Sequence, residues 1–454
     1  MDAWVTDLEK QMNEVHAKSW RTNSDPVSIF RVPPNLRWNN TKYNDPNLIY
    51  AAGPYDPRFV SIGPYHHGKK HLLPMEASKW CSLRKLVSKN DNPSMKMKSC
   101  LNALKDMEKN ARSCYSEFID MESDKFVEML LLDGCFIVSI LNSVQQELLV
   151  PSDRGDAEDD GGLIHSTVWI WGEVKKDLLL LENQIPFFVI RKLCELLINT
   201  VNVTSYPISL ALDCLSTCYP GKMCHPKKNT APSEEPCHLL HLFYFSILAP
   251  LPQSPFAGNS DTKEWIPSAT RLKEAGIKLK VKDSNSFLDV AFHQGTLEIP
   301  ALDLSNGSES VLRNLIAFEQ CYDPQRLKSG LPKRLHHLAD YAFFMDCLVD
   351  RAEDIVVLED AKIVLNWRGS EEMATSMFNQ LTVEVNWDSG SNYLSRLFVD
   401  VREHSDSRPH RWRAKLVRDY FSTPWSIISL AAAFVLLILT LLQTVYTMKS
   451  YLHF

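Results

Sequence analysis

FVEMLLLDGCFIVSILNSVQQELL, residues 126–149, is the longest apolar stretch in the first half of the chain. It is apolar on nearly all sides, which is typical of a helix enclosed by other parts of a protein or by lipid. Glu128 and Asp133 interrupt the apolar run, whereas a membrane span usually carries about 20 apolar residues with few or no charges. We therefore expect a central core helix of a globular domain at this position.

The segments around this helix predict further helices. Helical spacing of apolar residues predicts a helix from Pro74 to Val87, with Pro74 suited to its first turn. In DLLLLENQIPFFV, residues 177–189, one apolar helix is expected to end near Glu182–Gln184 and Pro186 to start another. Most of the chain is therefore expected to be helical.

Strand patterns are short and lie mainly in the second half of the chain. Apolar residues alternate with lysines from Ile277 to Lys282, and residues 287–300 look like two short strands that turn near Gln294-Gly295. An earlier strand is expected over Phe59–Ile62 and ends at Gly63-Pro64. The predicted fold class is α+β: a predominantly α-helical globular domain with a small β-sheet, plus one C-terminal transmembrane helix.

Residues 427–446, IISLAAAFVLLILTLLQTVY, predict the transmembrane helix. They form a run of twenty residues without a charge, which as a helix matches the roughly 30 Å hydrocarbon core of a bilayer. Basic residues gather before the run and only Lys449 follows it, which predicts that the large N-terminal part stays in the cytosol. We expect a single-pass, tail-anchored membrane protein, in either the plasma membrane or an endomembrane.

These patterns divide the chain into five parts. The predicted parts are an N-terminal lead-in (1–26), a mainly helical cytosolic domain (27–404) with loops at 151–162 and 214–236, a basic juxtamembrane segment (405–424), the transmembrane helix (425–448) and a short tail (449–454).

The net charge and the cysteine positions indicate which partners and which cellular compartment to expect. The formal net charge of -6 is small for 454 residues, so we expect no nucleic-acid partner. Most of the eleven cysteines lie in apolar runs, as free thiols in a reducing compartment do. The N-terminus has acidic residues and no apolar core of the length that a secretory signal requires.

The histidine-rich stretch VSIGPYHHGKKHLLPMEASKW, residues 60–80, is the first candidate for chemistry. His67 and His71 have the spacing of a helical metal pair, and Glu76 could be a third ligand. However, Gly68 and Pro74 interrupt the helix that such a pair requires. The competing interpretation, which we favour, is a tight turn whose aromatic rings pack on the core.

Four cysteines form the second candidate: Cys214, Cys218, Cys224 and Cys237. Their spacing lacks the CxxC pairs of common zinc sites, so ordinary thiols are favoured over a structural zinc ion. We expect no cofactor and assign no catalytic residue. Glu182, Asp133 and Asp289 lie in apolar runs, where hydrogen bonding at a helix end explains a buried carboxylate more often than catalysis does.

Several motifs together resemble the plant family called domain of unknown function 247. They are IFRVPPNLR (29–37), YDPRFVSIGPYHHG (55–68), LLPMEASKW (72–80), MLLLDGCFIV (129–138), DLLLLENQIPFFV (177–189), SATRLKEAGIKLK (268–280), RNLIAFEQC (313–321) and the C-terminal span. The resemblance implies a mostly helical cytosolic domain with a C-terminal membrane anchor, and it supplies no catalytic residue. Some grass members are linked to pollen-side recognition in self-incompatibility. The motif positions of unknown role are Gly63, Pro64, Tyr65, His66, His67, Gly68, Glu182, Asn183, Gln184 and Pro186.

Three functions compete on these grounds. The favoured hypothesis is a non-enzymatic recognition or signalling protein, anchored in a membrane through residues 427–446 and binding an unidentified protein partner, with pollen self-incompatibility as one example. The first alternative is a metal-dependent enzyme that uses the His66, His67 and His71 cluster. The second is a structural membrane tether without a specific partner.

Overall fold

The computed structural model describes most of the chain. The described residues are 4–10, 12, 27–38, 53–88, 92–149, 168–198, 206–221, 235–248, 265–305, 307–322, 336–385, 392–407, 412, 413, 415 and 424–452. The predicted loop at 151–162 and most of the loop at 214–236 lie outside them.

Helix α5 (Ser123–Leu149) is the centre of the N-terminal half of the domain. It contacts α3 (Glu76–Ser88), α4 (Pro93–Ser113), α8 (Phe187–Leu197) and α9 (Tyr206–Leu215). Gly134 allows α8 to approach closely, because a Cβ at this position would lie 2.3 Å from Cδ1 of Leu193. Of its most apolar window, Ser123–Ser143, 78% is buried inside the domain. The prediction of a central core helix is confirmed.

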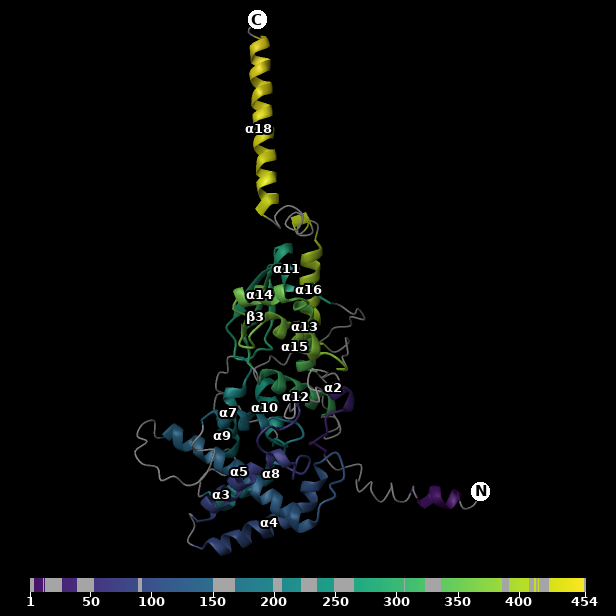
Figure 1. The fold of residues 1–454 in the computed structure, drawn as a ribbon, viewed down its shortest axis with the longest axis vertical. Helices are drawn as coiled ribbons and strands as arrows, with labels where there is room; N and C mark the ends of the chain where they lie inside the picture. The colour runs from purple at the N-terminus through teal and green to yellow at the C-terminus, as the bar shows by residue number, and fades with distance from the viewer. Residues whose placement is uncertain are drawn as a thin grey trace.

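The other helices of the domain pack around this core or extend it toward the C-terminal half (Figure 1). They are α2 (Pro34–Trp38), η2 (Lys70–Met75), α7 (Val168–Asp177), η3 (Ser216–Cys218), α10 (Leu239–Leu248), α11 (Ala269–Ala275), α12 (Ser308–Cys321), α13 (His337–Leu348), α14 (Ala352–Asp360), α15 (Glu371–Leu381) and α16 (Ser395–Asp406). In Figure 1, α3 and α4 lie at one end of the domain and α11, α14 and α16 at the other. One cluster of buried apolar side chains runs through both halves.

Two small sheets lie in the C-terminal half. Strands β1 (Lys278–Lys282), β3 (Thr296–Pro300) and β2 (Ala291–His293) form the first in the order β1-β3-β2, with β1 parallel and β2 antiparallel to β3. Gln294 and Gly295 connect β2 and β3 with φ angles of 48° and 75°, the left-handed conformation of a tight hairpin turn. In the second sheet, β4 (Leu302–Leu304) pairs in parallel with β5 (Val364–Asn366). The predicted turn is confirmed, and β5 joins β4 from a distant part of the chain.

Two expected boundaries are wrong, because buried side chains take over the bonding of the backbone there. Residues 59–62 are not a strand: the backbone N–H groups of Phe59, Val60 and Ile62 donate to side chains and not to a neighbouring strand. The helix expected to end near Glu182–Gln184 ends at Asp177, and a series of turns occupies the residues up to Pro186. The helix expected from Pro74 is present, although its first residues belong to η2 and α3 begins at Glu76.

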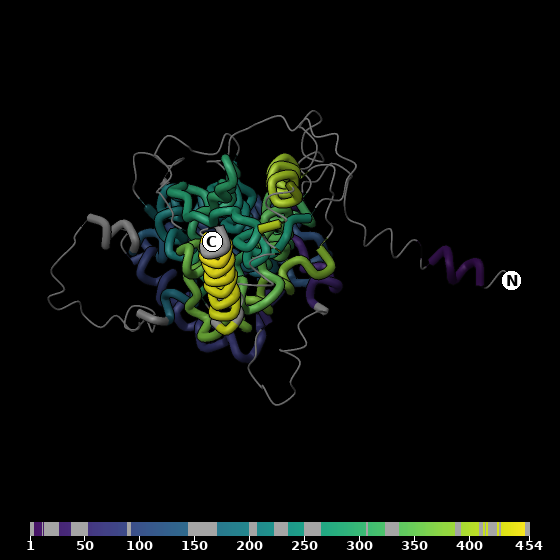
Figure 2. Tube along the Cα trace, turned by 90° about the horizontal axis from the view of Figure 1, so that it is seen from above, coloured from purple at the N-terminus to yellow at the C-terminus, as the bar shows by residue number. Residues whose placement is uncertain are grey.

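Helix α18 (Pro424–Leu452) stands apart from the domain. It extends beyond the end at which α11 and α16 lie, and Figure 2 shows it nearly end-on in front of the domain. Its apolar window, Ile428–Lys449, is long enough to cross a membrane, and no part of that window is buried. The protein is thus mostly helical with small sheets and has one exposed apolar helix at its C-terminal end.

Candidate functional site

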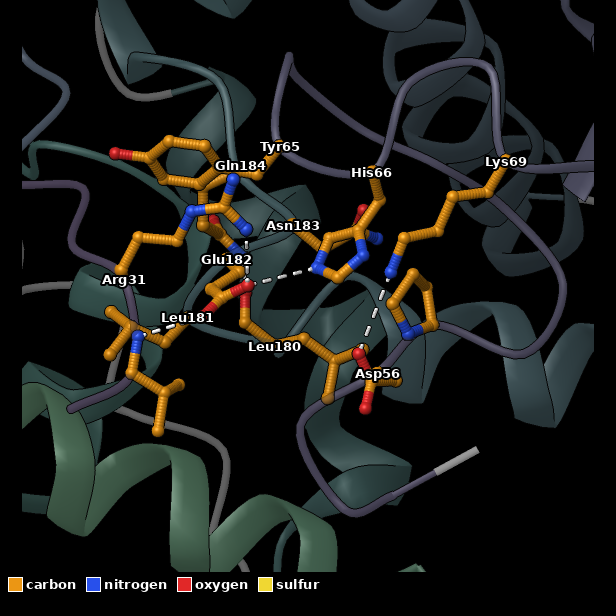
Figure 3. A network of polar contacts seen from close by, with 12 residues as sticks. Arg31, Asp56, Tyr65, His66, Lys69, Leu180, Leu181, Glu182, Asn183 and Gln184 are labelled. Atoms are coloured by element: carbon orange, nitrogen blue, oxygen red, sulfur yellow. Dashed lines mark hydrogen bonds and ion pairs between the residues drawn. The ribbon is translucent and has the colours of Figure 1, made fainter. Parts of the chain in front are cut away.

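Glu182 is the centre of a buried polar network that joins the motif around residues 177–186 to the N-terminal motifs (Figure 3). Its side chain is 1% exposed. Oε1 accepts the backbone N–H of Val32 at 2.8 Å and lies 2.7 Å from Nη2 of Arg37. Oε2 lies 3.1 Å from Nη1 of Arg31 and 3.3 Å from Nε2 of His66. The carboxylate of Glu182 therefore holds the residues at the start of α2 next to the turn of residues 63–68, which we call the histidine turn.

The charges around Glu182 determine its protonation state. Burial raises the pKa of a carboxyl group, but His66, Arg37 and the N–H of Val32 outweigh it and lower the pKa of Glu182 to about 2. Burial lowers the pKa of His66, so its imidazole is neutral at pH 7. Nε2 of His66 faces the ionised carboxylate at 3.3 Å, a position that favours the neutral tautomer with its proton on Nε2.

Asn183 and Asp177 replace the strand partner that residues 58–62 lack. The Oδ1 atom of Asn183 accepts the N–H of Ile62 at 2.7 Å, and its Nδ2 donates to the carbonyl of Val60 at 3.0 Å. Oδ2 of Asp177 accepts the N–H groups of Phe59 at 2.7 Å and Val60 at 3.0 Å. These bonds satisfy buried backbone groups that would otherwise be costly.

The side chain of Gln184 also satisfies buried backbone groups, in the turns after α7 and at the start of α10. Its Nε2 donates to the carbonyls of Leu178 and Leu180, both at 2.8 Å, and its Oε1 accepts the N–H of Leu240 at 3.3 Å. The turns between α7 and α8 are therefore stabilised by the side chains of the motif itself.

A second buried ion pair lies next to the glycine of the histidine turn. Nζ of Lys79, which is fully buried, lies 2.6 Å from both Oδ1 of Asp133 and Oε1 of Glu76. Burial lowers the pKa of a lysine, but the two carboxylates outweigh it and raise the pKa of Lys79, so it stays charged. Oδ2 of Asp133 accepts the N–H of Gly63 at 2.8 Å. Asp133 is thus a structural anchor in the core helix.

Gly63 is required by this arrangement for two reasons. Its φ is +78°, which disfavours residues with a side chain. In addition, a Cβ on Gly63 would lie 2.3 Å from the carbonyl oxygen of Gln184. The backbone at Gly63 and the backbone at Gln184 are therefore in direct contact. The hydroxyl of Tyr115 donates to the same carbonyl oxygen of Gln184 at 3.1 Å and so stabilises this contact.

The structure does not bring the proposed histidine and glutamate ligands together. His67 is exposed, Nε2 of His71 lies 3.2 Å from the carbonyl oxygen of Pro57, and Glu76 is bound to Lys79. His66 points toward Glu182 from the turn that includes Pro64 and Tyr65 (Figure 3). Among the described residues, no three His, Cys, Asp or Glu side chains form a group that could hold a metal ion.

The cysteine candidates are distributed over separate elements. Cys214 is buried in α9, Cys218 lies in η3, and Cys237 precedes α10, while Cys224 lies outside the described residues. Cys218 borders a small cavity of about 150 Å³ that Lys176 and Asp303 also line. Burial raises the pKa of the Cys218 thiol to about 11, so it is protonated and a poor nucleophile at neutral pH.

Sequence reasoning missed four members of the network: Arg31, Arg37, Lys79 and Asp177. All four lie inside the motifs that the sequence analysis quoted. The signal that could have found them is a charged residue in an otherwise apolar motif, since such a residue is rarely buried without a partner. Chemically, the charged and amide side chains of this site hold together segments that lie far apart in the sequence, among them those around residues 32, 62, 133 and 182.

Comparisons with known proteins agree with the motif analysis. The model of a plant protein family of unknown function, DUF247, matches residues 29–439. The UPF0481 protein At3g47200 of Arabidopsis thaliana is 28% identical over 447 residues, covering 94% of this chain and 87% of the relative. The putative UPF0481 protein At3g02645 of the same plant is 22% identical over 536 residues, covering 97% and 93%. No solved structure matches the chain at a significant level.

Proposed function

The chain belongs to the plant DUF247 family, and from that premise we propose that it is a membrane-anchored protein that binds another protein through its helical domain and performs no catalysis. The observation that carries the proposal is the contrast between the two long apolar helices. α5 is mostly enclosed by the domain, whereas the apolar window of α18 is entirely exposed. Lipid is the medium in which a helix of this kind is stable.

The side chains of α18 support its insertion into a bilayer. Phe434, Leu436 and Leu439 are each more than half exposed, and a continuous apolar surface of this kind is rare on soluble proteins. Trp425 precedes the window and Tyr446 lies near its end, where aromatic residues meet the two membrane interfaces. The basic residues before α18 favour a cytosolic location for the domain.

An exposed apolar surface on the second sheet supports protein binding. The N–H of Trp367 donates to the carbonyl of Leu304 at 3.1 Å and so extends the pairing of β5, which places Leu365 and Trp367 on one side of the strand. Their exposed fractions are 43% and 69%, and Met373 nearby in sequence is 44% exposed. Tryptophan is among the residues that most often dominate the energy of protein interfaces.

Two experiments test the anchor and the partner separately. Alkaline carbonate extraction of plant-cell membranes should leave the full chain in the membrane fraction, and a variant without residues 427–446 should become soluble. Proximity labelling should then identify the same neighbours for the full chain and for a variant with an unrelated span, but fewer for Trp367→Glu. The matched control is Trp80→Glu, which replaces another half-exposed tryptophan, on α3.

Either of two results would refute the proposal. Extraction of the full chain by carbonate would refute the anchor, and purified full chain that turns over a substrate would refute the lack of catalysis. Loss of the neighbours in the Trp80→Glu variant but not in Trp367→Glu would place the binding surface elsewhere. If the labelled neighbours are the same for the full chain, for the variant with an unrelated span and for both tryptophan variants, a structural tether is favoured.

The narrower prediction of pollen recognition in self-incompatibility rests on the resemblance to grass members alone. It requires expression in pollen and a change of pollen rejection when the gene is disrupted. Normal rejection in such a plant would remove this role and leave the membrane-anchored binding domain.

A further inference from the structure

Three basic side chains form a surface where α11 joins β1. Arg271 and Lys273 belong to α11, and Lys278 is the first residue of β1. All three are exposed, and none has an ion-pair partner among the residues that the structure describes. Gly276, with φ of +95°, makes the sharp turn that brings helix and strand together. We refer to Arg271, Lys273 and Lys278 as the basic surface.

Nearby carboxylates neutralise the other lysines of β1 but not the basic surface. Lys280 lies 3.5 Å from Glu298, and Lys282 lies 2.7 Å from Asp289. Glu274 is the one acidic residue in α11. The basic surface itself therefore carries three positive charges against the one carboxylate of Glu274, and this local charge attracts an anionic partner, while α14, which packs against α11, adds the exposed carboxylates of Glu353 and Asp360 beside it.

The basic surface is close to the point where the chain leaves for α18. Nη1 of Arg413 lies 3.5 Å from the carbonyl oxygen of Lys273. Pro424, the first residue of α18, lies eleven residues after Arg413, and eleven residues of fully extended chain span at most about 40 Å. Figure 1 likewise places α11 at the end of the domain toward α18. Trp265, which precedes α11 and is 52% exposed, adds an aromatic side chain of the kind found at membrane interfaces.

We propose that the basic surface docks onto the anionic phospholipid headgroups of the membrane that holds α18. The inference rests on the proposed membrane anchor and adds an orientation to it: the α11 end of the domain faces the bilayer. The cytosolic leaflet carries a negative surface potential, and each basic residue near it is attracted. Because the anchor keeps the surface near the membrane at all times, a weak contact of three charges is sufficient to hold the domain against it.

Lysine footprinting of the full chain in lipid nanodiscs tests this orientation. The nanodiscs contain either phosphatidylcholine alone or phosphatidylcholine with 30% phosphatidylserine, and acetylation of each lysine is measured by mass spectrometry. Co-elution of the chain with both kinds of nanodisc first establishes that α18 is inserted. Lys273 and Lys278 should then be labelled at least threefold more slowly in the anionic nanodiscs. Lys98 and Lys109 on α4, exposed at the opposite end of the domain, are the internal control.

Salt and charge reversal complete the test. Protection should disappear in 1 M salt, where the screening length falls to about 3 Å. It should also disappear for Lys278 in the Arg271→Glu/Lys273→Glu variant, while the matched Lys98→Glu/Lys109→Glu variant keeps it. Failure of the chain to enter nanodiscs would refute the anchor itself. Insertion with equal labelling of Lys273 and Lys278 in both lipids, or with protection that survives 1 M salt, would overturn the lipid contact.

Discussion

Replacing Glu182 with glutamine should destabilise the domain by about 3 kcal/mol. The change keeps the shape of the side chain and an acceptor for the N–H of Val32, but removes the charge that Arg31 and Arg37 contact. The difference between the ordinary carboxyl pKa of 4.5 and the value of about 2 in the folded protein corresponds to about 3 kcal/mol. Removing one partner of a buried ion pair costs about 3–5 kcal/mol in other proteins, which agrees with this magnitude.

The measurement is urea unfolding of the full chain in detergent, followed by tryptophan fluorescence. The matched control is Glu117→Gln, because Glu117 also pairs with Arg31, at 3.1 Å, but is 54% exposed. An exposed pair contributes about 0–1 kcal/mol, so this variant should unfold close to the wild type. The pH dependence adds a check: because the folded pKa of Glu182 is lowered, its contribution is present above pH 4.5 and is lost as the pH falls toward 2. If the two variants unfold at the same urea concentration, the buried network does not stabilise the fold as argued.

Three further predictions concern the same network and the buried histidines. Lys79→Met should cost about 3–5 kcal/mol in urea unfolding by leaving Asp133 without its cation, and Lys79→Met/Asp133→Asn, which removes the charge but keeps an acceptor for the N–H of Gly63, should recover much of the loss; an additive double variant would contradict this. Gly63→Ala should cost more than about 2 kcal/mol, since both its φ and its close carbonyl contact oppose a Cβ, whereas Gly68→Ala, with the same φ of +78° and open space, should cost about 1 kcal/mol in the same assay; equal losses would show that the contact is unimportant. His238 is fully buried just before α10, with its Nε2 2.9 Å from the carbonyl oxygen of Ser28, and burial lowers its pKa to about 4. The unfolded chain therefore takes up a proton first as the pH falls below 6.5, and thermal unfolding at pH 5 should show about 2 kcal/mol less stability from this residue than at pH 7. A His238→Gln variant with unchanged pH dependence would refute that assignment.

Local pattern was sufficient where local bonding decides the structure. The central helix, the hairpin turn at Gln294-Gly295 and the exposed C-terminal helix follow from periodicity, turn chemistry and length, and the structure has all three. For residues 59–62 the sequence predicts a strand, because their apolar character is the same whether a strand or the side chains of Asp177 and Asn183 satisfy the backbone.

The candidate site was predictable in its members but not in its connections. Glu182, Asn183, Gln184, Gly63 and His66 were singled out from the motifs, yet no local rule connects residue 182 to residue 32. Such contacts depend on how α5 and α8 pack, which spacing along the sequence does not reveal. The spacing of His67 and His71 also suggested a metal pair, whereas the structure exposes His67 and directs His71 to the carbonyl of Pro57.

The bond between Val32 and Glu182 joins residues 150 positions apart, and this separation has a consequence for synthesis of the chain. At about 5–20 residues per second, a ribosome adds that length in roughly 8–30 s. During this interval Arg31 and Arg37 lack the carboxylate of Glu182. The N–H groups of residues 58, 59, 60 and 62 likewise lack their acceptors on Asp177 and Asn183. The N-terminal motifs therefore gain their full set of buried partners only after residue 183 has been added, and we expect a shorter nascent chain to expose these motifs to chaperones.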